Sequence, residues 1–263
     1  MRATNNRLNR FVAVVLAVAV VASLGVGGSF AAVQDDEDAQ VRIAHLSPDA
    51  PAVDVLVDGD AVLEGAEFGD VSDYMNLSAG EHNVTIQTSE NESVVFQDNV
   101  SVEAGTAYTI AATGEVSQDT FEPRVFEDDF EMPSDENATV RLIHASPDAP
   151  DVDVTVADSD TVLFDNVSFG NATDYAEVPA GDYGLEVRPA TADNDGEVVT
   201  TVNVTVEGGT VYSAVAAGYL SPDEAAADTP FEVLLVTDSG GDTMMGNETT
   251  TEETMDNETT TEA

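Results

Sequence analysis

The feature that most constrains this chain is an internal repeat. Residues 41–57 read VRIAHLSPDAPAVDVLV, and residues 140–156 read VRLIHASPDAPDVDVTV, so two closely similar stretches lie 99 residues apart. Self-similarity at a long interval indicates that one structural unit occurs twice. We therefore expect two modules with the same fold, and any activity of the module should leave its residues in both copies.

Apolar residues recur at every second position within each module. This alternation is clearest at residues 53–57, 82–86, 152–156 and 202–206, and Gly-containing turn signals such as Asp58-Gly59 separate the runs. A period of two is typical of half-buried strands, and no segment has a helical stripe. With about seven short strands per module, the sequence predicts an all-β protein of two tandem Ig-like β-sandwiches.

Composition divides the chain into six parts. Three arginines precede the uncharged run 11–28 and a small-x-Ala pattern, as in a signal peptide. The run is almost long enough to remain as an uncleaved anchor instead. The predicted parts are a signal peptide with a signal helix at 1–31, an acidic spacer at 32–39, module 1 at 40–126, an acidic linker at 127–138, module 2 at 139–237, and a disordered Thr/Glu-rich tail at 238–263.

The chain is strongly acidic. It has 52 Asp and Glu against seven Arg, no Lys, and a formal net charge of −45. At molar salt the Debye length falls to about 3 Å, which screens such self-repulsion. The composition therefore favours a halophilic protein over an acidic partner-binding one, and the lack of a basic patch excludes nucleic-acid binding. The chain has no cysteine, which excludes disulfides and thiolate sites.

Asparagine usage points to export and glycosylation. After residue 34 the chain has eleven Asn, and ten of them begin an N-x-S/T sequon. Such sequons are acceptor sites for N-linked glycans on exported proteins. The predicted sites are Asn76, Asn83, Asn91, Asn99, Asn137, Asn166, Asn171, Asn203, Asn247 and Asn257.

The SPDAP segments are predicted to join two strands. Ser-Pro starts turns, and the second proline disfavours α conformation at the alanine before it. The aspartate can bond a nearby backbone N–H as an Asx turn does, so the motif makes structural sense without a ligand. The repeated residues, interpreted as a structural motif or a ligand site, are Arg42, His45, Ser47, Pro48, Asp49, Pro51, Asp54, Arg141, His144, Ser146, Pro147, Asp148, Pro150 and Asp153.

These two motif copies, each followed by a later Tyr-containing strand, carry a family resemblance. The pattern V-R-hydrophobic-x-H-x-S-P-D-A-P-x-V-D-V resembles domain-of-unknown-function family 4397, here of a haloarchaeal type, over about residues 40–237. The resemblance implies secreted or surface β-sandwich domains, often in tandem. The family brings no established catalytic residues with it.

The repeated histidines have two readings. They can act as metal ligands with neighbouring aspartates, or they can sit at the sheet rim bonded to backbone. The alternation places His45 with Val41 and Ile43 and favours the structural reading. The potential ligand sets are His45 with Asp49 and Asp54, and His144 with Asp148 and Asp153. A calcium site at Asp58, Asp60 and Glu64 is a further candidate, although the spacing is not that of an EF-hand.

The repeated arginines also have two readings. Arg42 can pair with Asp54 across strands, and Arg141 with Asp153. Because exposed ion pairs contribute only about 0–1 kcal/mol, we expect instead partly shielded arginines that hold the SPDAP turns by bidentate hydrogen bonds. Ligand binding is the alternative.

The sequence as a whole predicts a non-catalytic protein outside the cell. None of the common catalytic motifs is present. We expect an exported, N-glycosylated, halophilic surface protein with a structural or adhesive role, whose partners are cell-envelope components or extracellular glycans. The alternative is an extracellular solute- or carbohydrate-binding module. Neither reading requires a cofactor.

Overall fold

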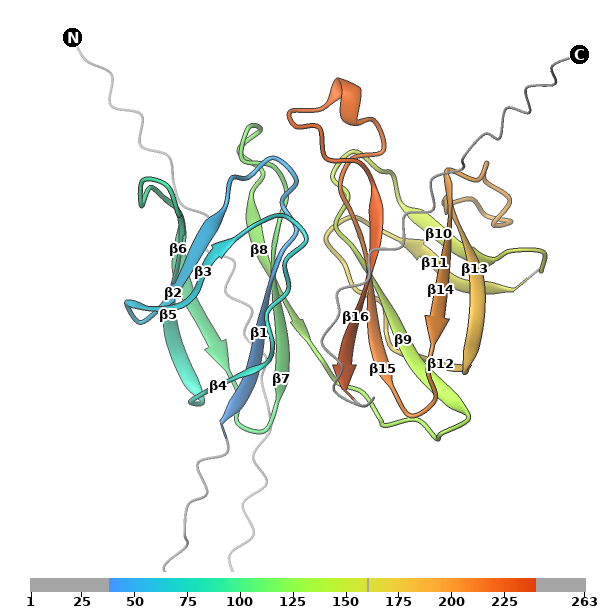
Figure 1. Ribbon diagram of the computed structural model, residues 1–263, viewed down its shortest axis with the longest axis horizontal. Helices are drawn as coiled ribbons and strands as arrows, with labels where there is room; N and C mark the ends of the chain where they lie inside the picture. The colour runs from blue at the N-terminus through green and yellow to red at the C-terminus, as the bar shows by residue number, and fades with distance from the viewer. Residues whose placement is uncertain (1–37, 160, 240–263) are drawn as a thin grey trace, which may run out of the picture. The chain divides into compact units, whose positions relative to one another are not determined.

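The computed structural model describes residues 38–159 and 161–239, and Figure 1 shows two β-sandwiches built from them. The strands of the first sandwich are β1 (Ala39–His45), β2 (Val53–Val57), β3 (Asp60–Ala66), β4 (Met75–Leu77), β5 (Gly80–Thr88), β6 (Val94–Val102), β7 (Ala107–Thr113) and β8 (Glu122–Glu127). Those of the second are β9 (Asn137–His144), β10 (Val152–Val156), β11 (Val162–Val167), β12 (Ala176–Pro179), β13 (Gly181–Pro189), β14 (Thr200–Val206), β15 (Val211–Ala217) and β16 (Glu232–Ser239), with a 3-10 turn η1 (Pro222–Glu224) before β16.

Each sandwich consists of two four-stranded sheets, and the two copies have the same topology. The sheets of the first are β4-β1-β7-β8 and β3-β2-β5-β6, and those of the second are β12-β9-β15-β16 and β11-β10-β13-β14. β1 pairs with β7 in parallel, as β9 does with β15, while the other strand pairs are antiparallel. The prediction of an all-β protein with two tandem sandwiches is confirmed.

Each sandwich encloses its own apolar core. In the first, aliphatic side chains of β1, β2 and β5 meet, among them Ile43, Val55 and Ile86. In the second, side chains of β9, β10, β13 and β15 meet around Phe164. The alternation seen in the sequence therefore marks strands whose inner face packs on the facing sheet.

A third apolar cluster joins the two sandwiches. It contains Ala44 and Ala111 from the first sandwich and Ile143, Val215 and Leu234 from the second. The central strands of the sheets β4-β1-β7-β8 and β12-β9-β15-β16 are thus covered on both faces. This explains why every residue of β15 is buried, a pattern normally seen in strands covered on both sides.

The strands extend beyond some predicted part boundaries. β8 ends at Glu127 and β9 begins at Asn137, so both reach into the predicted linker. β16 ends at Ser239, two residues into the predicted tail. The predicted signal peptide and signal helix, and the tail from residue 240, lie outside the described residues.

Candidate functional site

The aspartates of the two SPDAP segments hold distant loops. The Asp49 carboxylate accepts hydrogen bonds from the backbone N–H groups of Val116 and Ser117, both at 2.8 Å. The Asp148 carboxylate accepts from Leu220 and Ser221 at 2.9 Å. Each carboxylate therefore binds the loop that follows β7 or β15. The expectation of a local Asx turn is wrong, since the donors lie 67–73 residues away along the chain.

Other groups of the first SPDAP segment make long-range contacts as well. The Ser47 hydroxyl donates to the Gly114 carbonyl at 2.7 Å. The Pro48 carbonyl accepts from the Thr229 hydroxyl of the second sandwich at 2.8 Å. In the second copy, the Ser146 hydroxyl instead donates to Asp148 at 3.3 Å. The motif thus ties its own loops together and, through Pro48, reaches the other sandwich.

The repeated histidines are buried and bonded to backbone, the arrangement expected for structural histidines. His45 Nε2 lies 3.2 Å from the Pro51 carbonyl, and His144 Nε2 lies 3.0 Å from the Pro150 carbonyl. Burial removes water from the imidazolium form, which lowers the pKa of both rings. Neutral rings that donate from Nε2 account for these contacts.

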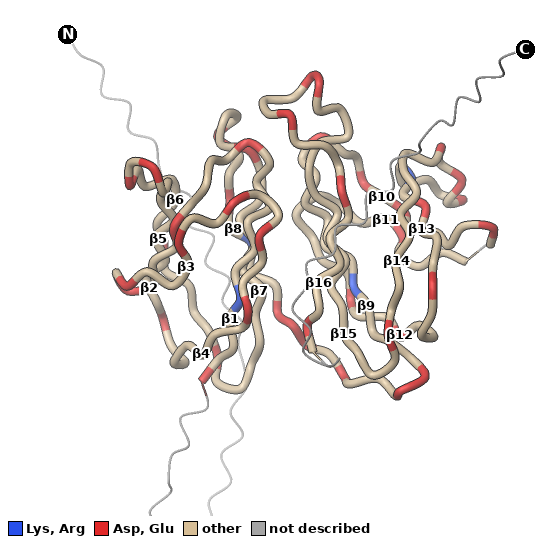
Figure 2. The backbone as a smooth tube through the Cα atoms, viewed as in Figure 1, with Lys and Arg blue, Asp and Glu red and all other residues tan. Residues whose placement is uncertain are grey.

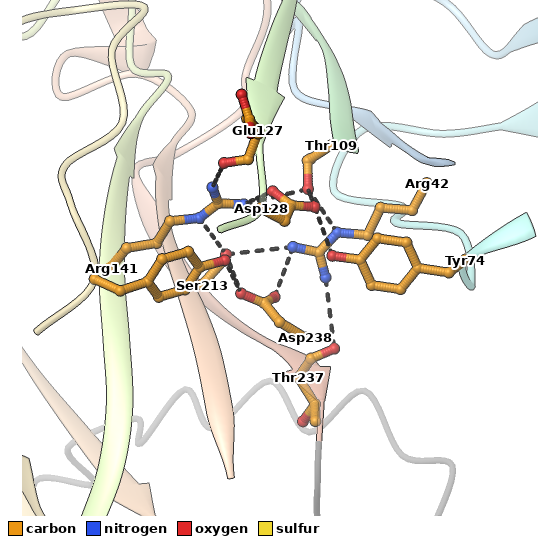
Figure 3. Close-up of polar contacts among 10 residues, drawn as sticks. Arg42, Tyr74, Thr109, Glu127, Asp128, Arg141, Ser213, Thr237 and Asp238 are labelled. Atoms are coloured by element: carbon orange, nitrogen blue, oxygen red, sulfur yellow. Dashed lines mark hydrogen bonds and ion pairs between the residues drawn. The ribbon is translucent and has the colours of Figure 1, made fainter. Parts of the chain in front are cut away.

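The repeated arginines meet at the interface between the sandwiches. Figure 3 shows Arg42 of β1 reaching Asp238 of β16, with Nη2 2.6 Å from Oδ1. Arg141 of β9 reaches back to Asp128, which follows β8. Each arginine therefore forms an ion pair with an aspartate of the other sandwich. We call these four residues, with the side chains that bond them, the interface network.

Two small hydroxyl groups connect the halves of the network. Arg42 Nε donates to the Thr109 hydroxyl at 2.8 Å, and Arg141 Nε donates to the Ser213 hydroxyl at 2.8 Å. Thr109 in turn donates to Asp128 at 2.8 Å, and Ser213 donates to Asp238 at 2.7 Å. The Nη2 of each arginine also reaches the hydroxyl of the other sandwich at 3.3 Å.

Two tyrosines complete the network with the same symmetry. The Tyr74 hydroxyl donates to Asp128 and the Tyr175 hydroxyl donates to Asp238, both at 2.6 Å. The guanidinium carbons of Arg42 and Arg141 lie 4.9 and 4.7 Å from the ring centres of Tyr74 and Tyr175. The two halves of the interface thus repeat the same contacts in reverse.

The charges of the network balance within a buried environment. The side chains of all four charged residues are at most 2% exposed. Burial by itself would lower the pKa of Arg42, but the charge of Asp238 leaves that pKa above its usual value, so the guanidinium stays charged. Burial also raises the pKa of Tyr74 and Tyr175, which keeps both hydroxyls protonated as donors. Buried pairs are screened by salt far less than surface pairs.

The predicted partners of the arginines are wrong. Asp54 accepts instead from Gly65 N at 2.8 Å and from the Ser89 hydroxyl at 2.6 Å. Asp153 accepts from Asn166 N at 2.8 Å and from Thr191 N at 3.0 Å. Neither arginine holds its SPDAP turn. The alternation correctly turns the arginines away from the sandwich core, but that face is covered by the second sandwich and not by solvent.

Most members of the network are not recognisable from the sequence of one module. Asp128 lies in the predicted linker and Asp238 in the predicted tail, although both are buried. Tyr74 and Tyr175 are recognisable from the repeat. Each is the last residue of a repeated G-x-x-S/T-D-Y stretch, which begins at residue 69 in the first copy and at residue 170 in the second. Each interface hydroxyl also follows a repeated strand tyrosine. A residue-by-residue alignment of the two modules would have found these positions.

The interface has a further polar contact, at its SPDAP end. The Tyr219 hydroxyl donates to Glu115 Oε1 at 2.9 Å. The two residues follow Gly114 and Gly218, so they occupy the same position in the two copies. Burial raises the pKa of Tyr219, which favours the protonated donor. Two residues at equivalent positions of the two copies thus contact each other across the interface.

Asp58, one of the residues considered for calcium, has other partners. Asp58 accepts from Asn83 N at 2.9 Å and contacts His82 Nδ1 at 2.7 Å. This hydrogen bond raises the pKa of His82. Over residues 38–159 and 161–239, we find no group of three His, Asp or Glu side chains arranged to hold a metal ion.

An open groove lies beside one half of the network. It has a volume of about 780 Å³ and is bordered by residues 125–132 on one side and 172–177 on the other. The rings of Phe130 and Tyr175 pack edge to face, with their centres 5.5 Å apart. The Met132 side chain is 55% exposed. Acidic side chains of both segments line the groove. Its size is in the range of small-molecule sites.

The sequon asparagines of the described chain lie on strands and turns of both sandwiches. Figure 2 shows acidic residues in many loops of both sandwiches. Among residues 38–159 and 161–239, no helix has the length and hydrophobicity to cross a membrane. The sequon asparagines that are exposed are Asn76, Asn91, Asn99, Asn166, Asn171 and Asn203, and those that are half-buried are Asn83 and Asn137; Asn247 and Asn257 lie outside the described residues.

Comparison with known proteins gives one family match. The model of the domain of unknown function DUF4397 matches residues 39–155 and 138–248. No curated protein sequence matches the chain.

Several solved structures resemble the chain, all at low identity. A streptococcal virulence factor described as binding alpha-glucan is 13% identical, with 67% of this chain and 93% of that chain covered and a TM-score of 0.23. A family 26 carbohydrate-binding module from Eubacterium rectale, in complex with maltoheptaose, is 10% identical over 77% and 98%, with a TM-score of 0.22. A putative cell adhesion protein from Bacteroides fragilis is 8% identical over 78% and 100%, with a TM-score of 0.20.

Proposed function

This chain belongs to the DUF4397 family, with two tandem copies of its domain, and we propose that it is an exported, N-glycosylated, halophilic cell-surface protein with a structural or adhesive role. Its partners are cell-envelope components or extracellular glycans. The observation that carries the proposal is the interface network. It places the arginines common to both modules in the joint between the two sandwiches, with side chains at most 2% exposed.

A rigid pair of sandwiches suits a structural role. Ion pairs that cross the interface, a shared apolar cluster and the Tyr219–Glu115 contact all resist separation of the sandwiches. Breaking one buried pair by removing a partner costs about 3–5 kcal/mol, so hinge motion at this joint is costly. A chain that must span or brace an envelope gains from such a joint.

A non-catalytic role agrees with the state of the titratable residues. His45 and His144 are buried, with lowered pKa values, and bond to backbone carbonyls. Asp49 and Asp148 bond to backbone N–H groups. None of these repeated groups is placed as a nucleophile or a general base over an open pocket.

The support for halophily comes from the composition of the sequence. A net charge of −45 would loosen a compact domain in dilute buffer, and molar salt screens that repulsion. Circular dichroism across a salt series tests this directly. We expect a cooperative β-sheet fold at molar salt that is lost at low salt, and a fold indifferent to salt would contradict halophily.

The first functional experiment is the intact mass of the native protein from washed envelopes and from the medium. We expect a chain that starts near Ala32 and carries discrete glycan increments. Deletion of the gene should then alter envelope integrity or cell contact. An unprocessed, unmodified mass would overturn the proposal, and so would polysaccharide turnover that a single carboxylate change abolishes.

A second candidate function is an extracellular solute- or carbohydrate-binding module. The groove of about 780 Å³ favours it, because an exposed apolar residue, Met132, lies there beside carboxylates that can accept hydrogen bonds from hydroxyl groups. Isothermal titration of neutral oligosaccharides tests it. Binding that is lost on Phe130→Ala and kept on Phe121→Ala, a change outside the groove, would favour this candidate over the structural one.

A further inference from the structure

Two of the sequon asparagines face each other on neighbouring strands. Asn83 of β5 lies directly opposite Asn99 of β6 in the antiparallel register. Their side chains are bonded, with Asn83 Nδ2 donating to Asn99 Oδ1 at 3.0 Å. Each begins its own sequon, Asn83-Val-Thr and Asn99-Val-Ser. Two acceptor nitrogens for a glycan therefore lie side by side on one sheet face.

The two carboxamides differ in how much they are engaged. Asn83 is half-buried, and its Oδ1 accepts from Gln97 Nε2 at 3.1 Å and from the Thr85 hydroxyl at 3.5 Å. Its Nδ2 is the donor to Asn99. The Asn99 side chain is exposed, and its Nδ2 donates only to exposed Glu81, at 3.1 Å. The Nδ2 atom of Asn99 is thus the more accessible of the two.

We propose that Asn83 and Asn99 form one shared glycosylation site, at which a single chain carries at most one glycan, on Asn99. This inference rests on the proposed glycosylation. In the reaction, Asn99 Nδ2 bonds to the anomeric carbon of an oligosaccharide carried as a diphosphate ester. The anomeric carbon–oxygen bond breaks, the diphosphate leaves with its electron pair, one Nδ2 proton passes to solvent, and nothing is oxidised.

Space on the sheet accounts for the exclusion. Directly opposite Cβ atoms lie about 4.5–5.5 Å apart, and neighbouring strands about 4.8 Å apart. A pyranose ring with its substituents is at least this wide, so two rings cannot stand side by side on opposed residues. A glycan on Asn99 leaves Oδ1 free to accept from Asn83, whereas a glycan on Asn83 replaces an N–H of the donor nitrogen itself.

The second sandwich contains a built-in control. Asn203 of β14 lies opposite Gly184 of β13, which has no side chain. Asn203 is exposed and begins the sequon Asn203-Val-Thr. A glycan on Asn203 meets no second sequon across the strands. We therefore expect Asn203 to be modified whether or not Asn83 and Asn99 compete.

The test uses the full chain made in its native host. Ser78→Ala and Ser93→Ala remove the sequons of Asn76 and Asn91 while leaving both asparagines in place. No Lys or Arg lies between Arg42 and Arg124, so trypsin releases residues 43–124 as one piece with only the two opposed sequons left. Its mass counts the glycans per chain, and fragmentation locates them.

We expect one glycan per piece, on Asn99, and a glycan on Asn203 in the same preparation. Asn83→Gln should leave the single glycan in place. Pieces with two glycans, with a glycan on Asn83 while Asn99 is bare, or with none while Asn203 is modified would overturn the shared site alone. A bare Asn203 together with bare Asn83 and Asn99 would overturn the proposed glycosylation and the shared site with it.

Discussion

The two sandwiches repeat the same polar contacts where they touch each other. Arg42 and Arg141 occupy the same position of β1 and β9, and each is buried against an aspartate of the other copy. Tyr74 and Tyr175 likewise make the same bond to those aspartates. The interface is therefore self-complementary, as the interface of a twofold-symmetric dimer is.

The copies differ on the sheets that face away from the interface. His82 in the first takes the place of Tyr183 in the second, although both side chains bond the carbonyl four residues before them, Ser78 or Pro179. Asn83, opposite Asn99, takes the place of Gly184, opposite Asn203. At these positions the shared residues join the two sandwiches, and the residues that differ lie on the sheets away from the interface.

The largest expected effect comes from breaking one ion pair of the interface. Asp238→Asn leaves the buried Arg42 without its charged partner, and Asp128→Asn does the same to Arg141. Each change should lower the free energy of unfolding by about 3–5 kcal/mol. Denaturant unfolding at molar salt measures it. Because the halves of the network repeat each other, the two losses should be similar.

The matched control is Asp223→Asn in η1, which removes the same charge from an exposed residue. We expect almost no change in unfolding there. If either interface variant unfolded like this control, the network would not join the sandwiches. If one variant lost much more free energy of unfolding than the other, the two ion pairs would share their geometry but would not contribute equally to stability.

The next effect comes from the glycines that turn the chain after β7 and β15. Gly114 and Gly218 have φ of +80° and +83°, and an added Cβ would collide with the carbonyl oxygens of Thr120 and Pro230. Strain and collision together should cost at least about 2 kcal/mol for either substitution by alanine. Thermal unfolding of the two variants tests whether the equivalence of the copies extends to these loops.

Gly65→Ala provides the comparison for these glycines. Gly65 also has a positive φ, +67°, but nothing lies within 4 Å of an added Cβ. Its substitution should therefore cost only the backbone strain, about 1 kcal/mol. Equal losses at Gly65 and Gly218 would show that the carbonyl contact contributes nothing.

The fold could be predicted because its signals are local. Apolar residues at every second position and Gly-containing turns predict the strands and the two modules. Residues 53–57, which form β2, and residues 152–156, which form β10, are examples. Backbone bonding of His45 and His144 also followed, since alternation puts these rings on the core face. Strand periodicity and turn chemistry decide such features without knowledge of the second module.

The interface could not be predicted from one module, because alternation says which face a residue lies on and not what covers that face. Arg42 and Arg141 do point away from their own cores. If solvent covers the face, a partner on the neighbouring strand such as Asp54 is expected. Because another sandwich covers it, Arg42 pairs with Asp238, 196 residues away along the chain, and Arg141 with Asp128, 13 residues away. Asp128 and Asp238 were assigned to a linker and a tail because an acidic run normally indicates solvent.

The buried histidines should make the stability of both copies depend on pH. Burial lowers the pKa of His45 and His144 in the folded protein. The unfolded chain then binds more protons below its own pKa of about 6.5, so stability is lost as the pH falls through this value. The slope per histidine is at most about 1.4 kcal/mol per pH unit.

The two rings should respond for different reasons. Nδ1 of His45 has no hydrogen-bond partner in the part of the chain described here, so protonation buries an unpaired N–H. Nδ1 of His144 accepts from Ser146 N at 3.4 Å, so protonation breaks that contact. Urea unfolding between pH 5 and 8 of His45→Gln and His144→Gln should show a flatter pH dependence than the parent chain. An unchanged slope would contradict the buried neutral state.

The smallest expected effect comes from making the outer sheets more alike. In the first copy, His82 contacts Asp58, which raises the pKa of the ring, so its contribution is present below about pH 6.5 and disappears as the pH rises through the folded pKa. His82→Tyr introduces the residue of the second copy, which can keep the bond to the Ser78 carbonyl but not the charge. We expect the midpoint of thermal unfolding to fall by less than about 2 °C at pH 5.5, and not at all at pH 8.5. This dependence has the opposite sign to that of His45 and His144, so scanning calorimetry at the two pH values distinguishes the effect of His82 from theirs. A loss of the same size at both pH values would mean that the ring acts by packing, and that the difference between the copies at this position is one of shape and not of charge.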